Sequence, residues 1–329
     1  MDIAVILAGG KGSRMKRKIN KVLEKICEKP IIMHLIDILR AKNLKIYVVI
    51  GNSGQEIKNA LGDSVEYIIQ QKALGTGDAL KCACEQIKEN PDYILVLNGD
   101  GPIVELPLID KMLSCDFDLK LLTATKDKNS NFGRILRKNE KIAGIIEAKD
   151  CTTEQLKFTE VNLGLYCFKY DVLCRYITNL SRNNAQNEYY VTDLVKIFYN
   201  HNFNIKSINA DNFFVLNGVN TVSELNFAEQ KMRALIQKKL AEKGVRLIDK
   251  NVYIDMFSSI GKGCTIYPNV YIKNSILGEN VTILPNCFLE NAIVKSDITI
   301  GANCVLTGVN VDKNLSHSTT IINIKNDIC

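Results

Sequence analysis

The chain has 329 residues, of which 46% are hydrophobic and 24% charged, which is enough apolar material for one large domain and a smaller one. Its 42 Lys and Arg against 36 Asp and Glu leave a net charge of +6 with no basic block, which argues against nucleic-acid binding and fits a small anionic ligand. The chain shows no signal-peptide pattern and no apolar run of membrane-spanning length, so we expect a cytoplasmic protein with no membrane partner.

The first part of the chain alternates between two kinds of apolar pattern. Strands are expected at 3–8, 46–50, 93–97 and 119–125, and amphipathic helices at 31–42, 55–61 and 78–89. This alternation predicts an α/β fold with a Rossmann-like, mostly parallel sheet, whose ligands bind at the carboxyl edge. Later strands, near 142–147, 161–168 and 205–209, are interpreted as an inserted lobe that faces the substrate.

Two turns place polar groups at the carboxyl edge of the expected sheet. The first strand ends in the run Ala8-Gly9-Gly10-Lys11-Gly12-Ser13-Arg14, and the third ends in Asn98-Gly99-Asp100. The first run is neither a dinucleotide fingerprint nor a P-loop. Its glycines let backbone N–H groups approach a phosphate, and Arg14 adds a charged donor, although tight turns also use glycine for structural reasons alone.

A different period begins near residue 222. Apolar residues at helical spacing predict a helix over 222–243, which Gly244 ends. Aliphatic residues then recur every six positions, as at Ile254, Ile260, Ile266 and Ile272, and the repeat reaches Leu306. Six-residue repeats are typical of the hexapeptide parallel β-helix. The repeat slips by one residue near Asn274 and Asn291, which we interpret as irregular corners.

These patterns divide the chain into four parts. They are an α/β domain at 1–221, a linker helix at 222–243, a short left-handed β-helix at 244–312 and a polar tail at 313–329. Such a short stack needs capping or oligomerisation to protect its ends. The 11 cysteines are scattered and include no Cys-x-x-Cys pair, so we interpret them as reduced core residues.

Several motifs, in order along the chain, resemble those of the sugar-phosphate nucleotidylyltransferases. The likeness is greatest to the uridylyltransferase half of the bacterial bifunctional N-acetylglucosamine-1-phosphate uridylyltransferase/glucosamine-1-phosphate acetyltransferases. The matching blocks are Leu7-Ala8-Gly9-Gly10-Lys11-Gly12-Ser13-Arg14-Met15, Lys21-Val22-Leu23, Gln70, Leu74-Gly75-Thr76-Gly77, Gly99-Asp100, Gly133-Arg134-Ile135, Ile146-Glu147-Ala148-Lys149-Asp150, Asn162-Leu163-Gly164, Asn184 to Asp193 and Gly218-Val219-Asn220.

The resemblance implies a role for each matching residue. Arg14 and Lys21 would be catalytic, because they neutralise phosphate charge, and Asp100 with Asn220 would ligate Mg²⁺. Gln70, Gly75 and Thr76 would read uracil. Gly133, Glu147 and Asn162 would bind the sugar. Other contacts to the substrates would come from Leu7, Ala8, Gly9, Gly10, Asn98, Gly99 and Asn220.

The implied reaction is attack of an N-acetylglucosamine-1-phosphate oxygen, or that of a close hexosamine-1-phosphate, on the α-phosphorus of UTP. Pyrophosphate leaves, and no general base is needed because the attacking phosphate is already ionised. Two alternatives stay open: a nucleotidylyltransferase for another nucleotide or sugar-1-phosphate, and a non-catalytic regulatory subunit of the same fold. Likeness to other hexapeptide-repeat proteins implies a homo-oligomer, namely a trimer.

The sequence also departs from the family at several positions. Asn20 replaces a proline, so we expect a looser phosphate loop, and Gly101 and Leu163 alter the expected metal and sugar surroundings. The exact sugar and nucleotide are therefore open. The family's acetyltransferase needs later β-helix coils and a histidine base, whereas here the only histidine after the first domain is His317, so we expect no acetyl transfer.

Overall fold

The computed structural model describes residues 2–10, 15, 19–52, 54–101, 103–114, 116–127, 130–211, 215–216 and 218–323. The chain divides into two compact units. The first consists of Met1–Glu24 and Pro30–Val222, and the second of Lys25–Lys29 and Ser223–Cys329. Among the described residues, nine cysteines are free thiols, and no helix has the length and apolar character needed to cross a membrane.

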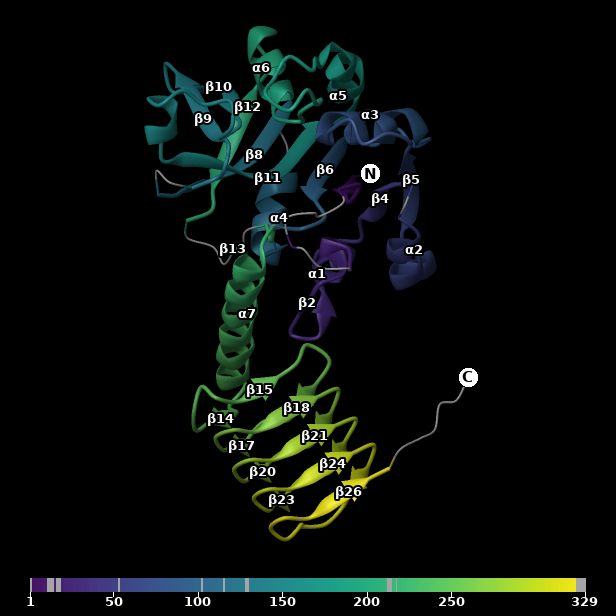
Figure 1. Cartoon of the computed structure of the whole chain (residues 1–329), viewed down its shortest axis with the longest axis vertical. Helices are drawn as coiled ribbons and strands as arrows, with labels where there is room; N and C mark the ends of the chain where they lie inside the picture. The colour runs from purple at the N-terminus through teal and green to yellow at the C-terminus, as the bar shows by residue number, and fades with distance from the viewer. Residues whose placement is uncertain are drawn as a thin grey trace. The chain divides into compact units, whose positions relative to one another are not determined.

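A nine-stranded sheet organises the first unit (Figure 1). Its main path runs in the order β10-β9-β11-β6-β1-β4-β5, while β8 pairs with β11 and β12 pairs with β8. The parallel strands of the path are β1 (Ile3–Leu7), β4 (Lys45–Gly51), β5 (Glu66–Gln70) and β6 (Tyr93–Asn98). The others are β8 (Leu119–Thr125), β9 (Arg134–Lys138), β10 (Lys141–Ile146), β11 (Glu160–Lys169) and β12 (Ile205–Asn209).

Helices cover both faces of this sheet. On one face lie α3 (Thr76–Gln86), α5 (Tyr170–Tyr176) and α6 (Asp193–Asn200), whose apolar residues share a cluster with Ile3, Val5 and Leu7 of β1. The alternate residues Ala4 and Ile6 are also buried. They face the side covered by α1 (Ile31–Arg40) and α4 (Leu106–Leu113) (Figure 1). The expected α/β fold is confirmed. Its strands could be found in the sequence because strands that are buried on both faces consist of continuous apolar runs.

Short elements complete the first unit. They are η2 (Lys21–Leu23), α2 (Gln55–Leu61), η3 (Gly62–Ser64), η4 (Gln155–Lys157), η5 (Ile177–Asn179) and the antiparallel pair β7 (Ile103–Val104) and β13 (Val215–Leu216). Of these elements η2 matters most here, because it carries Lys21.

The strands expected to form an inserted lobe belong instead to the main sheet. β11 pairs antiparallel with β6, with Leu165 opposite Leu97, and β12 pairs parallel with β8. The reason is burial: eight consecutive residues of β11, from Val161 to Phe168, are buried, so this strand needs neighbours on both edges and layers on both faces. The interpretation as a separate lobe was wrong, and the residues expected to bind sugar lie in or next to strands of the main sheet.

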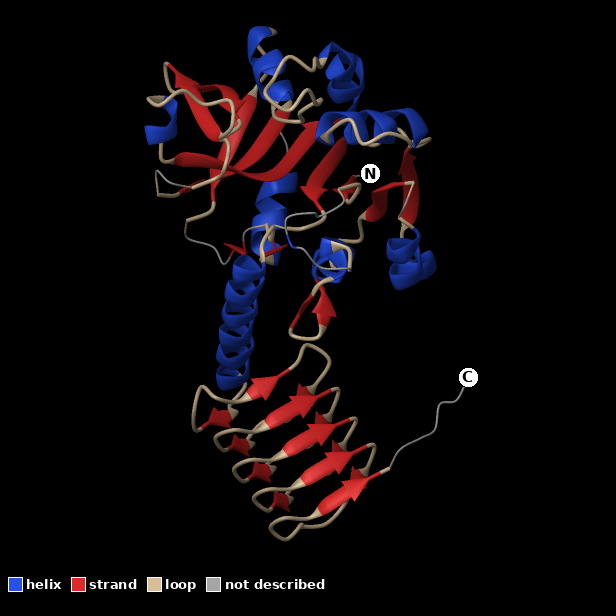
Figure 2. Cartoon of the chain, viewed as in Figure 1, coloured by secondary structure: helices blue, strands red, loops and turns tan. Residues whose placement is uncertain are grey.

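The second unit is a parallel β-helix preceded by α7 (Val222–Glu242) (Figure 2). Three parallel sheets form its sides. They are β14 (Arg246–Leu247), β17 (Thr265–Ile266), β20 (Thr282–Ile283) and β23 (Thr299–Ile300); β15 (Tyr253–Ile254), β18 (Tyr271–Lys273), β21 (Phe288–Glu290), β24 (Val305–Thr307) and β26 (Thr320–Ile322); and β16 (Ser259–Ile260), β19 (Ile276–Leu277), β22 (Ile293–Val294) and β25 (Asn310–Val311).

One coil in the body of the β-helix has 17 residues. The Asn274 Nδ2 donates to Asn291 Oδ1 at 2.6 Å, and Asn269 donates likewise to Asn286 at 3.1 Å, each pair being 17 positions apart. Asn274 and Asn291 have φ of 44° and 52°, a left-handed corner that asparagine tolerates better than most residues. The one-residue slips are therefore not irregularities. They recur once per coil, so each coil consists of two six-residue sides and one five-residue side.

Two segments belong to the second unit although the sequence analysis placed them elsewhere, one in the polar tail and one in the first domain. The region after residue 312 continues the stack, because β26 pairs with β24 and Leu315 bridges Ile300. Residues 324–329 lie outside the described part of the chain. The hairpin of β2 (Lys25–Ile26) and β3 (Lys29–Pro30) also belongs to this unit, since the Cys27 backbone N–H donates to Glu229 Oε2 at 2.7 Å.

Candidate active site

Lys21, Asp100 and Asn220 meet at the carboxyl edge of the parallel strands. The Lys21 Nζ lies 2.5 Å from Asp100 Oδ2 and donates to Asn220 Oδ1 at 3.1 Å. The Lys21 and Asp100 side chains are mostly buried, with exposed fractions of 16% and 14%. Three segments far apart in the sequence thus place one cation between two oxygen acceptors.

Close backbone packing fixes Asp100. The Gly99 N–H donates to the Leu7 carbonyl at 2.8 Å, and the Val219 N–H donates to the Asp100 carbonyl at 2.9 Å. A Cβ at Gly99 would lie 3.1 Å from the Ala8 Cβ and 3.2 Å from Val22 Cγ1, so only glycine fits between the ends of β1 and η2 without displacing them.

Asn20 stabilises the turn that carries Lys21. Its Oδ1 accepts a hydrogen bond from the Val22 N–H at 3.2 Å, which caps η2. The departure from proline therefore does not leave this turn unsupported, and the expectation of a looser loop finds no support at the Lys21 end. The other expected catalytic residue, Arg14, lies outside the described residues.

Gln70 and the segment Gly75–Thr76 lie beside the glycine turn. Gln70 is buried, and its Nε2 donates to the Gly75 carbonyl at 3.2 Å and to Asp78 Oδ2 at 2.7 Å. A Cβ at Gly9 would lie 2.8 Å from Gln70 Oε1, so the glycine backbone passes close to this amide. Gln70 already donates both amide hydrogens within the chain, which leaves Oε1 for a ligand.

The segment after Gln70 is held by residues of a matching block to which the sequence analysis assigned no role. Gly75 has φ of 112°, and a Cβ there would lie 2.4 Å from the Tyr189 carbonyl oxygen. The Gly77 N–H donates to that carbonyl at 2.8 Å, and Thr76 Oγ1 accepts from the Val191 N–H at 3.2 Å. The block from Asn184 to Asp193 thus supports Gly75 and Thr76, which explains its place among the matching motifs.

The three residues expected to bind sugar lie in or directly next to three adjacent strands. Arg134 of β9 lies opposite Ile146 of β10 and Val161 of β11, and these precede Glu147 and Asn162 directly. Gly133 precedes Arg134. The register therefore gathers Gly133, Glu147 and Asn162 at one end of the strands.

Polar neighbours orient the side chains of Glu147 and Asn162. Glu147 Oε1 accepts a hydrogen bond from the Thr192 hydroxyl at 3.0 Å. The Asn162 Nδ2 donates to the Tyr166 hydroxyl oxygen at 2.6 Å, and its Oδ1 accepts from the Gly164 N–H at 3.2 Å. A register shift in β11 between Asn162 and Tyr166 makes this local contact possible. Sequence reasoning missed Thr192 and Tyr166, although Thr192 lies in a matching block.

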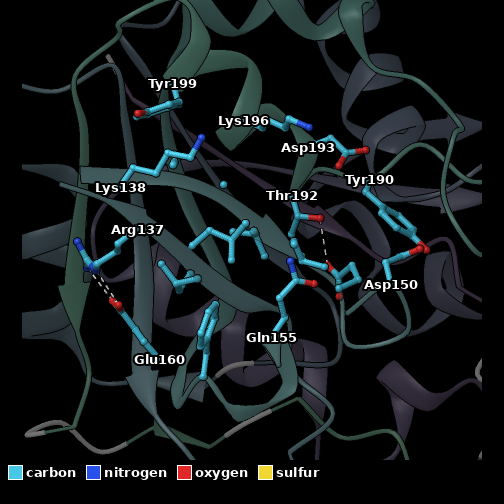
Figure 3. A pocket seen from close by; sticks show the side chains of 18 of the residues that line it. Arg137, Lys138, Asp150, Gln155, Glu160, Tyr190, Thr192, Asp193, Lys196 and Tyr199 are labelled. Carbon is cyan, nitrogen blue, oxygen red and sulfur yellow. Dashed lines mark hydrogen bonds and ion pairs between the residues drawn. The ribbon is translucent and has the colours of Figure 1, made fainter. Parts of the chain in front are cut away.

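Figure 3 shows a cavity of about 1040 Å³, and Glu147 is one of its lining residues. Tyr190, Thr192, Asp193 and Asp150 line it near Glu147, and the Arg137–Glu160 ion pair lines its far part. Burial raises the pKa of Glu147, the Thr192 hydrogen bond opposes that rise, and the charges of Asp150 and Asp193 add to it. A hydroxyl-rich neutral ligand suits this end of the cavity, because hydroxyl donors would replace the lost solvation of the carboxylate.

The oxygen pair of Asp100 and Asn220 suits a hard cation. A carboxylate and an amide oxygen are ligands that Mg²⁺ accepts, and the Lys21 ammonium now lies where the two oxygens converge. Within the described ranges there is no cluster of three or more His, Cys, Asp or Glu residues with metal-binding geometry. The set therefore fits an ion that keeps water or ligand oxygens in its remaining positions.

Comparison with known proteins places this site in a class. Residues 4–130 match the MobA-like NTP transferase domain, and residues 237–326 match the GMPPB C-terminal domain. A structure from Bacillus anthracis described as a glucose-1-phosphate thymidylyltransferase covers 70% of this chain and 94% of its own, with a TM-score of 0.58 and 24% identity. The first unit is thus a nucleotidyltransferase domain in fold.

Two curated relatives match most of the chain. The bifunctional protein GlmU of Clostridium novyi (strain NT) is 37% identical over 302 residues, which span 83% of this chain and 66% of that protein. GlmU of Bacillus subtilis (strain 168) is 36% identical over 280 residues, which span 83% of this chain and 61% of that protein. The chain is thus similar to these bifunctional proteins over most of its own length, and it spans less than two thirds of the length of these relatives.

Proposed function

We propose that this protein transfers a uridylyl group from UTP to N-acetylglucosamine-1-phosphate, or to a close hexosamine-1-phosphate. The products are the UDP-sugar and pyrophosphate. A phosphate oxygen of the sugar-1-phosphate forms a new bond to the α-phosphorus of UTP, and the bond from that phosphorus to the bridging oxygen of pyrophosphate breaks. The observation that carries the proposal is the meeting of Lys21, Asp100 and Asn220 at the sheet edge.

Lys21 stabilises charge in this proposal. Its ammonium is mostly buried at the sheet edge, and once it leaves Asp100 it can face the phosphate oxygens, on which negative charge accumulates in the transition state. Arg14 is proposed as the second cation on the same phosphates. Neither residue has to remove a proton, because the attacking phosphate is ionised at neutral pH.

Asp100 and Asn220 are proposed as the protein ligands of Mg²⁺. When bound, Mg²⁺ supplies positive charge to the phosphate oxygens of the nucleotide and orients them for in-line displacement. For the chain's own residues this arrangement requires Lys21 to give up its direct contact with Asp100, which frees its ammonium for phosphate. The backbone at Asp100 is held by the hydrogen bonds of Gly99 and Val219.

The remaining residues are proposed to bind and orient the substrates. The backbone of Leu7, Ala8, Gly9 and Gly10, with Asn98 and Gly99, would hold the nucleotide at the sheet edge. Gln70 Oε1, with Gly75 and Thr76, would contact the base. Gly133, Glu147 and Asn162 would hydrogen-bond the sugar hydroxyl and amide groups, and Glu147 lines the cavity.

A second candidate is transfer of a different nucleotide or to a different sugar-1-phosphate. It is favoured by the commitment of both Gln70 amide hydrogens to Gly75 and Asp78, since uracil recognition would then rest on one acceptor and the backbone. Leu163, which is buried next to Asn162, departs from the family pattern and leaves the identity of the sugar open.

The proposal for this chain does not include acetyl transfer. Its second unit contains one histidine, His317, and the Nδ1 of that residue already accepts a hydrogen bond from the Ala302 N–H at 3.0 Å. We also propose that the protein works as a cytoplasmic homo-oligomer, a trimer, and that its division at 1–221, 222–243 and 244 onward separates catalysis from assembly. A pyrophosphate-release assay with UTP and N-acetylglucosamine-1-phosphate tests the central activity.

A further inference from the structure

Arg134 is a charged side chain with no solvent exposure, although it lies beside three sugar-side residues. Its exposed fraction is 0%, and it is among the largest fully buried side chains of the described residues. A guanidinium stays charged in proteins, so its burial is tolerable only where acceptors receive its hydrogens. The position of those acceptors therefore indicates what the side chain organises.

The acceptors belong to the segment that leads into Gly133. The Arg134 Nη2 donates to the Ser130 carbonyl at 2.8 Å, and its Nη1 donates to the Phe132 carbonyl. One planar fork thus ties down two carbonyls of the four residues before it. Because the fork is rigid, these two contacts fix the direction in which the chain enters β9.

That entry determines where Gly133 lies. The Gly133 carbonyl accepts a hydrogen bond from the Asn162 N–H at 2.9 Å. A Cβ at Gly133 would lie 2.9 Å from Ile145 Cγ2 and 3.4 Å from Glu147 Oε2, so its backbone is close to the carboxylate. The segment held by Arg134 is therefore in contact with both of the other residues that the proposed function assigns to sugar binding.

We propose that Arg134 is a positioning residue for sugar recognition, which holds Gly133 against Glu147 and Asn162 through its hydrogen bonds to the Ser130 and Phe132 carbonyls. This inference rests on the proposed function for the nature of the ligand, but not for the geometry. Among the described residues, Lys21 and Gln70 donate to Asp100, Asn220, Gly75 and Asp78 and not to Ser130 or Phe132, so we expect the loss of Arg134 to act on the residues proposed to bind the sugar. Its loss should therefore weaken sugar-1-phosphate binding and leave nucleotide binding unchanged.

The variants are Arg134→Gln, which removes the charge, and Arg134→Lys, which keeps the charge but cannot form the fork. Arg40→Gln is the matched control, because Arg40 also donates from a guanidinium to a backbone carbonyl, that of Ser64 at 2.9 Å, but on an exposed helix end. Hydrogen exchange of the 160–164 segment, which contains the Asn162 amide, is measured first, with the thermal unfolding midpoint of each variant.

We expect both Arg134 variants to exchange faster at 160–164 than the wild type, and Arg40→Gln to match the wild type there. In steady-state assays we expect the KM for sugar-1-phosphate to rise about tenfold or more in Arg134→Gln and less in Arg134→Lys, with the KM for UTP unchanged. Unchanged exchange at 160–164 would overturn the inference. An equal rise in both KM values, or exchange that increases throughout the first unit, would also overturn it, because either shows a general structural role.

The experiment separates this inference from the proposed function. If the wild type releases no pyrophosphate with any sugar-1-phosphate, the proposed function fails, and the sugar part of this inference fails with it. The exchange measurement needs no turnover, so it still decides whether Arg134 holds Gly133 against Asn162. If Arg134→Gln does not fold, Arg134→Lys carries the same two measurements.

Discussion

The ammonium group of Lys21 lies 2.5 Å from Asp100 Oδ2. Among the described residues, no other side chain donates a hydrogen bond to that oxygen. We predict that Lys21→Ala lowers kcat/KM by roughly two to three orders of magnitude, about 3–4 kcal/mol of transition-state stabilisation. Lys25→Ala is the control, because Lys25 is an exposed cation a short way along the chain. Steady-state kinetics on folded protein check the difference, and turnover of Lys21→Ala near that of the control would contradict the assigned role.

Asp100 gives a second prediction at the same scale. Asp100→Asn keeps the shape of the side chain but removes its charge, so we predict that a higher Mg²⁺ concentration is needed for half-maximal activity. Asn220→Ala should shift the titration in the same direction but less, because it removes a neutral ligand. A Mg²⁺ titration of both variants tests this, and a curve for Asp100→Asn that overlays the wild type would exclude Asp100 as a ligand.

The sequence predicted which residues gather at the site, but it did not predict the contacts that hold them there. Lys21, Asp100 and Asn220 were found through motifs, and the structure brings them together. The role of Asp78 in holding Gln70, and that of Thr192 in holding Glu147, could not be read from the sequence. Such pairs depend on side chains from different elements meeting in space, and neither pair has a local spacing that would signal it.

At the scale of elements, the β-helix depends on its inward-facing aliphatic residues. Ile283 of β20 is fully buried, and Ile266 and Ile300 lie beside it in the neighbouring coils. We predict that Ile283→Ala lowers the free energy of unfolding of the second unit by about 2–5 kcal/mol, because it leaves a cavity in a narrow core.

The control for this change is Lys262→Ala. It removes only an exposed ion pair with Glu279 at 3.6 Å, so we expect a change in unfolding free energy of about 1 kcal/mol or less. Chemical denaturation followed by a probe in the second unit compares the two variants. Equal stabilities for Ile283→Ala and the wild type would contradict the inward packing of this position.

The sequence predicted these elements unevenly, for physical reasons. The β-helix was readable because each inward position demands an aliphatic residue, so the repeat survives in the sequence. Strand β9 was missed, because its residues Arg134–Lys138 read as polar although the strand is paired on both sides. The last coil was missed as well, because β26 contributes mainly backbone to the ladder and its side chains are exposed.

At the scale of the whole molecule, exposed apolar residues on the β-helix favour self-association. Ile276 and Ile293, which are paired neighbours on β19 and β22, have exposed fractions of 51% and 45%. We predict that the protein is an oligomer, namely a trimer, and that Ile293→Asp dissociates it, because a charge in an apolar contact is costly to bury. Light scattering measures both, and a monomeric wild-type protein would contradict the prediction.

We propose that the site at the sheet edge makes a UDP-hexosamine. A pyrophosphate-release screen in Mg²⁺ that combines UTP, CTP, ATP and GTP in turn with several sugar-1-phosphates measures this activity. We expect the highest kcat/KM for UTP with N-acetylglucosamine-1-phosphate or a close hexosamine-1-phosphate, and loss of that signal in Lys21→Ala. A preference for another nucleotide, or no pyrophosphate release from any pair by folded protein, would contradict it.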